Sequence, residues 1–249
     1  MTEAFDTSIF PILSVLSLGF LLGLRHAFDP DHLAAVSTLV TEHPSPWRST
    51  LVGVSWGLGH TLALLAFGGA VVAFRIVLSP ELTGYLELAV AAVLIFLGAN
   101  VLSDLWPDLW KRRPVLHLHR HEHDGVLHTH LHVHRRSEEH TAQHQHRHHL
   151  LRLGRKPFLV GIVHGMGGTA ALVLLVVGVI PSALLAVFYI LIFGLGSIGG
   201  MVLISALMSL PLALAGKRIR SAERVLRFSA GCFSIAFGLF LVWRAGIFE

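Results

Sequence analysis

Apolar segments long enough to cross a lipid bilayer occupy most of this 249-residue sequence. Only 14% of the residues are charged, whereas a soluble globular domain carries roughly 25%. Backbone polar groups inside lipid must be satisfied within their own segment, so each apolar segment is expected to be a helix. The sequence therefore predicts an all-α integral membrane protein with about six transmembrane helices, at about 8–28, 51–78, 82–105, 158–180, 183–215 and 225–242.

The distribution of basic residues predicts how the chain is oriented. Lys and Arg concentrate in 111–156 and 217–227, and such loops lie on the cytoplasmic side of a membrane. Both termini are then outside, and the expected location is the inner (plasma) membrane. Three regions follow: a first three-helix membrane half at 1–110, a cytoplasmic histidine-rich loop at 111–156, and a second three-helix half at 157–249. No Lys or Arg precedes Arg25, unlike the basic start of a signal peptide, so the first helix is expected in the mature protein.

An internal repeat relates the two membrane halves. Residues 22–27 align with 160–165, residues 56–60 align with 193–197, and Gly98 aligns with Gly238, all at a nearly constant offset. Because three is odd, the two halves would have opposite orientations in the membrane. Inverted repeats with broken helices are typical of secondary transporters, which bind substrate between the repeats. Glycines at 194, 196, 199 and 200 are expected to interrupt the fifth helix.

Five ionisable side chains crowd into eight positions at the end of the first apolar segment: Arg25, His26, Asp29, Asp31 and His32. Pro30 disfavours helical geometry at Asp29, so a helix break is expected there. The break would let Asp31 and His32 turn back toward His26. Imidazoles and carboxylates suit divalent first-row metals, and two carboxylates would balance the ion's charge. We therefore expect a metal site here; the alternative is a solvated cytoplasmic loop.

Two further histidines lie inside apolar segments. His60 follows glycines at 57 and 59, and ionisable residues within a membrane are functional by default, which favours a ligand over a structural histidine. His164 holds the position of His26 in the second repeat, although its glycine neighbours also suit a helix-packing face. The predicted metal-binding residues are thus His26, Asp29, Asp31, His32, His60 and His164.

A histidine-rich tract separates the two halves. It contains thirteen histidines between His117 and His149, many of them at alternate positions, and a hairpin around Asp124-Gly125 would place these on one face. Short tracts of this composition indicate metal binding, here buffering or delivery of metal. The alternative is a flexible, pH-responsive linker.

The spacing His26-x4-Asp31-His32, followed by Gly57-x-Gly59-His60-Thr61, resembles the nickel/cobalt transporter superfamily of NicO and NiCoT permeases. Residues 161–171 resemble its short six-span branch of urease-accessory permeases. The resemblance implies roles in metal selection for His26, Asp31 and His32, with Asp29 also matching the pattern. It implies Ni²⁺ or Co²⁺ as transported substrate, no required cofactor, and a cytoplasmic metallochaperone or a urease or hydrogenase maturation protein as partner.

These observations together predict a secondary transporter of Ni²⁺, and also Co²⁺, acting in uptake rather than efflux. The alternatives are a nickel/cobalt efflux protein and a membrane-anchored protein that stores or senses metal through its histidine-rich loop. The lone Cys232 excludes a dithiol carrier. The sequence holds no Gly-x4-Gly-Lys-Ser/Thr phosphate loop for ATP coupling and no evident nucleophile for an enzyme. Its basic residues flank apolar segments, which favours the lipid bilayer over nucleic acid as partner.

Overall fold

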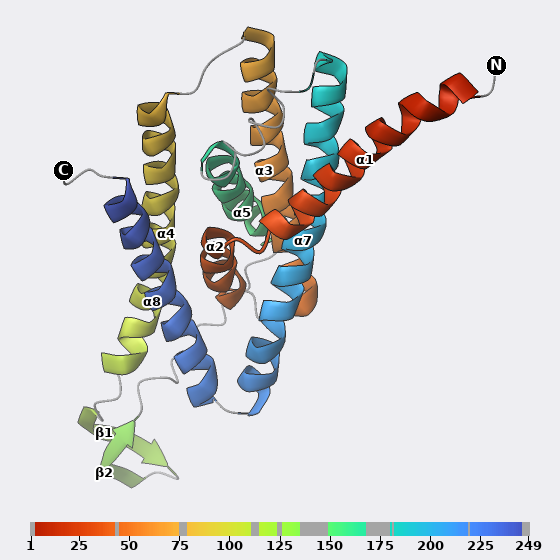
Figure 1. The fold of residues 1–249 in the computed structure, drawn as a ribbon. Coiled ribbons are helices and arrows are strands. Elements are labelled where there is room, and N and C mark those ends of the chain that lie inside the picture. The colour runs from red at the N-terminus through yellow and green to blue at the C-terminus, as the bar shows by residue number, and fades with distance from the viewer. Residues whose placement is uncertain are drawn as a thin grey trace.

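The computed structural model describes residues 3–42, 45–74, 79–110, 115–123, 126–134, 149–167, 180, 182–218 and 220–245. The helices in these ranges are α1 (Glu3–His26), α2 (Pro30–Thr41), α3 (Pro46–Phe74), α4 (Pro80–Trp110), α5 (His149–Met166), α7 (Ala183–Arg218) and α8 (Arg220–Arg244). Two strands, β1 (Val115–His123) and β2 (Val126–His134), lie at one end of the helical body (Figure 1).

Four of these helices are long and apolar enough to cross a membrane, at Pro46–Val71, Pro80–Leu105, Ala183–Leu214 and Ser221–Arg244. The helices on either side of residues 27–29 pass the same test as a bent pair, with an angle of 55° between them. The described residues thus hold four or five candidate spans of the six expected. The fourth expected span, 158–180, falls partly on 168–179, which lie outside the described residues. The chain is a multi-pass membrane protein.

The bend between α1 and α2 occurs where Pro30 predicted it. Asp29 is the N-cap residue of α2 with an extended backbone, φ −63° and ψ 149°. Pro30 starts the helix, a position where its missing N–H leaves no hydrogen bond unmade. The Leu33 N–H then donates to the Asp29 carbonyl at 3.0 Å and closes the first turn.

The expected interruption of the fifth span is wrong, because α7 runs without a break through its glycines. Three of them, Gly194, Gly196 and Gly200, let neighbouring helices approach closely instead. A Cβ atom at Gly196 would lie 2.2 Å from the Phe20 carbonyl oxygen of α1, and one at Gly194 would lie 2.2 Å from the Thr61 side chain of α3. Small residues at membrane helix contacts serve this purpose without distorting the helix.

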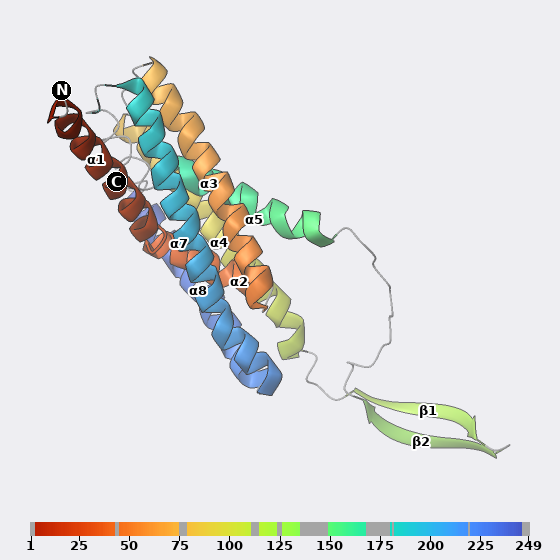
Figure 2. The same ribbon diagram turned by 90° about the vertical axis from the view of Figure 1, so that its right-hand side faces the viewer.

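α3 packs against α7, α1 lies against α7, α5 lies against α3, and α4 pairs with α8 (Figures 1 and 2). Two glycines let α1 and α5 contact the backbone of a neighbouring helix, and we call these two contacts the glycine seats. A Cβ atom at Gly23 of α1 would lie 2.0 Å from the Phe193 carbonyl oxygen of α7. A Cβ atom at Gly161 of α5 would lie 2.1 Å from the Trp56 carbonyl oxygen of α3. The glycine seats thus bring α1 into backbone contact with α7 and α5 into backbone contact with α3.

The histidine-rich segment contains an antiparallel hairpin, so the all-α prediction holds for the membrane part but not for this loop. Its register pairs His117 with His132, His119 with His130 and His121 with His128. The predicted turn at 124–125 and the rest of the tract at 135–148 lie outside the described residues.

Candidate metal site

Three buried histidines from three helices meet at the break between α1 and α2. His26 ends α1, His32 lies in the first turn of α2, and His60 lies midway along α3. Each offers a ring nitrogen, and the three nitrogens lie within 4.8 Å of one another. The residues are 7%, 1% and 1% exposed. This histidine cluster (His26, His32 and His60) is an arrangement that could hold one metal ion.

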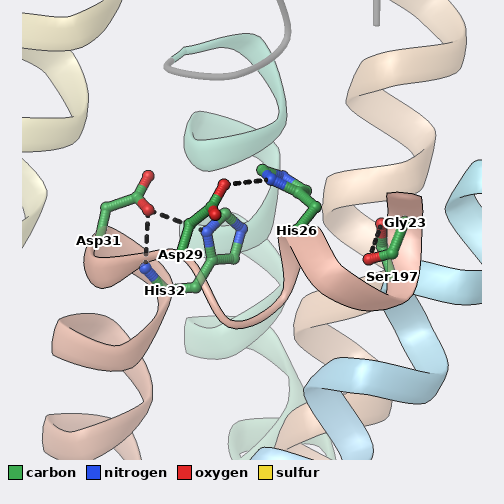
Figure 3. A network of polar contacts seen from close by, with 6 residues as sticks. All are labelled: Gly23, His26, Asp29, Asp31, His32 and Ser197. Atoms are coloured by element: carbon green, nitrogen blue, oxygen red, sulfur yellow. Dashed lines mark hydrogen bonds and ion pairs between the residues drawn. The ribbon is translucent and has the colours of Figure 1, made fainter. Parts of the chain in front are cut away.

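Two carboxylates orient the rings of this cluster (Figure 3). His26 Nδ1 lies 2.8 Å from Asp29 Oδ2, and His32 Nδ1 lies 3.1 Å from Asp31 Oδ1. The His32 backbone N–H also donates to Asp31 Oδ1, at 3.0 Å. A carboxylate at Nδ1 fixes the tautomer of an imidazole and leaves Nε2 as the metal-binding atom. His32 Nε2 is buried and has no hydrogen-bond partner in the described part of the chain.

His60 is buried on all sides. Neither of its ring nitrogens has a hydrogen-bond partner among the residues that the structure describes. Its ring centroid lies 5.1 Å from that of His26 and 5.3 Å from that of His32. Because buried polar atoms are nearly always paired, an imidazole in this state is suited to receive a ligand or an ion.

His164 lies next to the cluster but outside its group of three nitrogens. Its ring centroid is 5.4 Å from that of His32. His164 Nδ1 lies 3.1 Å from the Val160 carbonyl oxygen, to which a protonated Nδ1 donates. In that tautomer Nε2 is unprotonated and carries a lone pair. This atom is buried and has no hydrogen-bond partner in the described ranges.

The structure thus brings all six predicted residues to one place, in three different relations: three rings in the group, two carboxylates behind their rings, and His164 alongside. Arg25, from the same stretch of sequence, is exposed. The sequence interpretation did not single out Trp56, whose ring packs on His32, or Phe193, whose ring lies 5.5 Å from that of His26. The available signal for Trp56 was its position one helical turn before His60, on the same face of α3.

The chemistry of this site is that of buried imidazole nitrogens with two carboxylates beside them. Imidazole suits nickel, copper, zinc and iron, and carboxylates behind the ligands raise their basicity.

Comparison with known proteins identifies the family. Residues 12–240 match the NicO family, described as high-affinity nickel-transport protein. The chain is 34% identical over 238 residues to the urease accessory protein UreH of Bacillus sp. (strain TB-90), covering 96% of this chain and 94% of that protein. No solved structure matches it. The chain therefore belongs to the NicO family of high-affinity nickel-transport proteins, metal transporters rather than enzymes, for which nickel is substrate and not cofactor.

Proposed function

We propose that this protein takes up Ni²⁺ as a secondary transporter, with Co²⁺ as a competing substrate, and that the ion passes through the histidine cluster. The observation that carries the proposal is the meeting of three buried imidazole nitrogens, from α1, α2 and α3, within 4.8 Å of one another. Ionisable side chains are costly to bury in a membrane, and their presence in a transporter usually marks the route of the substrate.

In this proposal the ligands are His26, His32 and His60, with His164 as a fourth donor when the ion is bound. Asp29 and Asp31 act behind the rings of His26 and His32, since their carboxylates already contact the Nδ1 atoms. They hold the rings in place and balance the charge of the ion. This replaces the direct ligation by both carboxylates that the sequence pattern suggested.

We further propose that the two membrane halves are inverted repeats that rock against each other around the cluster. The supporting observation is the likeness of the two glycine seats. Gly23 rests against the backbone of Phe193 and Ser197, and the repeat-related Gly161 rests against that of Trp56 and His60. At the same repeat position, one half supplies a metal-binding imidazole and the other a hydroxyl. Ser197 Oγ donates to the Gly23 carbonyl at 3.2 Å (Figure 3).

The orientation proposed from the basic loops puts both termini outside and the histidine-rich hairpin in the cytoplasm. Uptake would then deliver the ion on the side of the hairpin, where its paired histidines could pass it to a cytoplasmic metallochaperone or maturation protein. This arrangement favours uptake over efflux.

The test is transport of radioactive nickel by the purified protein in sealed proteoliposomes, with and without competing Co²⁺. The variants are His26→Ala, His32→Ala and His60→Ala, and Ser197→Ala serves as the matched control at the repeat position of His60. We expect flux to be lost in the three histidine variants and kept in the control. Wild-type flux in all three histidine variants would remove the proposed route. Flux only out of vesicles in which the hairpin is inside would establish efflux.

A further inference from the structure

Trp56 lines the metal site but is not one of its proposed metal ligands. It lies on α3, one turn before His60, and is 1% exposed. Its ring centroid is 5.2 Å from that of His32 with 31° between the planes, and 5.9 Å from that of His164 with 90° between them. The indole therefore packs on one imidazole and meets the other edge to face.

The indole also carries a buried donor. Trp56 Nε1 has no hydrogen-bond acceptor in the described part of the chain. A buried tryptophan N–H usually finds a partner, and leaving one unpaired costs free energy. This N–H belongs to the residue whose ring contacts both His32 and His164. An acceptor that arrives with the substrate would therefore give the N–H its missing hydrogen bond.

A hydrated metal ion brings such an acceptor. The four imidazoles of the proposed site do not complete the coordination of Ni²⁺ or Co²⁺ when these ions take five or six ligands, and the remaining places go to water. Zn²⁺ in contrast is satisfied by four ligands in a tetrahedron. A donor beside the cluster therefore favours an ion that keeps a water ligand.

We propose that Trp56 is a specificity-determining residue, whose N–H donates to a water molecule on the bound ion. It thereby favours Ni²⁺ and Co²⁺ over four-coordinate Zn²⁺. This inference rests on the proposed function, because it requires the ion to bind at the histidine cluster. The repeat-related residue beside His26 is Phe193, whose ring has no hydrogen-bond donor and cannot make the same bond.

The experiment is metal titration of the full-length protein in detergent. Visible absorption reports how many ligands Co²⁺ has, and competition gives the affinities of Ni²⁺ and Zn²⁺. Trp56→Phe removes the donor and keeps an aromatic ring. Trp47→Phe, on the same helix but 72% exposed, is the matched control. We expect Trp56→Phe to shift the Ni²⁺/Zn²⁺ affinity ratio toward zinc by about tenfold or more, as loss of an outer-shell partner does. The Co²⁺ spectrum should move toward the intense bands of a four-coordinate ion.

A second measurement needs no folded variant at position 56. Ultraviolet resonance Raman spectra of the wild type should show a stronger indole N–H hydrogen bond after Ni²⁺ is added, and His60→Ala should not show it. An unchanged affinity ratio and Co²⁺ spectrum in Trp56→Phe would overturn the role of Trp56 while leaving the cluster intact, as would an unchanged indole band in the wild type. Wild-type metal binding by His60→Ala would instead overturn the cluster as the site, and with it the proposed function.

Discussion

Lys156 of α5 forms an ion pair with Glu42, the residue that follows α2. The Asn100 amide of α4 also donates to the same carboxylate oxygen, at 3.5 Å. α2 and α5 each also carry a histidine of the site. His32 is near the amino end of α2, and His164 is near the carboxyl end of α5. α2 and α5 are therefore connected twice, by the His32 and His164 rings at the amino end of α2 and by the Glu42–Lys156 ion pair at its carboxyl end.

A covalent link at this ion pair should stop transport if the two halves must move apart there. In a Cys232→Ser background, which removes the lone native cysteine, we expect Glu42→Cys with Lys156→Cys to lose nickel flux after treatment with a short bismaleimide. Untreated double variant and treated single variants are the controls, measured in proteoliposomes. Equal flux before and after cross-linking would show that the α2 and α5 ends stay together throughout the cycle.

The carboxylates of Asp29 and Asp31, which contact the Nδ1 atoms of His26 and His32, should modulate the affinity for Ni²⁺ without binding the ion themselves. In Asp29→Asn and Asp31→Asn an amide can still contact the ring nitrogen but no longer carries charge. We expect Ni²⁺ affinity to fall about 10–100-fold in each, the usual effect of losing a partner behind a metal ligand. His26→Ala and His32→Ala should lose high-affinity binding altogether. Calorimetric titration distinguishes the cases, and a loss in Asp31→Asn as complete as in His32→Ala would make that carboxylate a direct ligand.

The glycine seats should not tolerate a methyl group. Gly23→Ala and Gly161→Ala would place a Cβ atom 2.0 Å and 2.1 Å from the facing carbonyl oxygens, so the helices must separate. We expect each to destabilise the protein by about 1–3 kcal/mol, as overpacking does. Gly199→Ala on α7 meets nothing within 4 Å and should be neutral or stabilising. Thermal unfolding in detergent measures all three; a Gly23→Ala protein as stable as Gly199→Ala would contradict the contact.

Protons should compete with the metal. Imidazole nitrogens must be unprotonated to bind an ion, so affinity falls as the pH is lowered through the range in which histidine titrates. We expect nickel transport to be much weaker at about pH 5.5 than at about pH 7.5. The measurement is initial flux with equal pH on both sides of the membrane. Equal rates at both pH values would count against imidazole ligands, whereas a parallel loss of Ni²⁺ affinity in solution would assign the effect to binding.

The parts of the site that could be predicted are those governed by local rules. Pro30 disfavours helical geometry at Asp29, and a break there brings His32 back toward His26. The repeat alignment drew attention to His164 as the counterpart of His26. Trp56 and the Glu42–Lys156 pair could not be found in this way, because their partners are set by how α3, α5 and α2 pack. The continuous course of α7 could not be predicted for the same reason: Gly194, Gly196 and Gly200 make room for neighbouring helices, and the sequence pattern of a single helix does not show this.

The direction in which the chain runs at the break has its own electrostatic consequence. α1 ends at His26, and α5 ends at Met166, just beyond His164. Each helix presents its carboxyl end to the site, and such an end carries the equivalent of about half a negative charge. The opposing amino end of α2 has the Asp31 carboxylate in its first turn. Two carboxyl ends outweigh one amino end, and the Asp31 carboxylate offsets the positive charge of that amino end, so this place attracts a cation and repels an anion before any ring nitrogen distinguishes one metal from another.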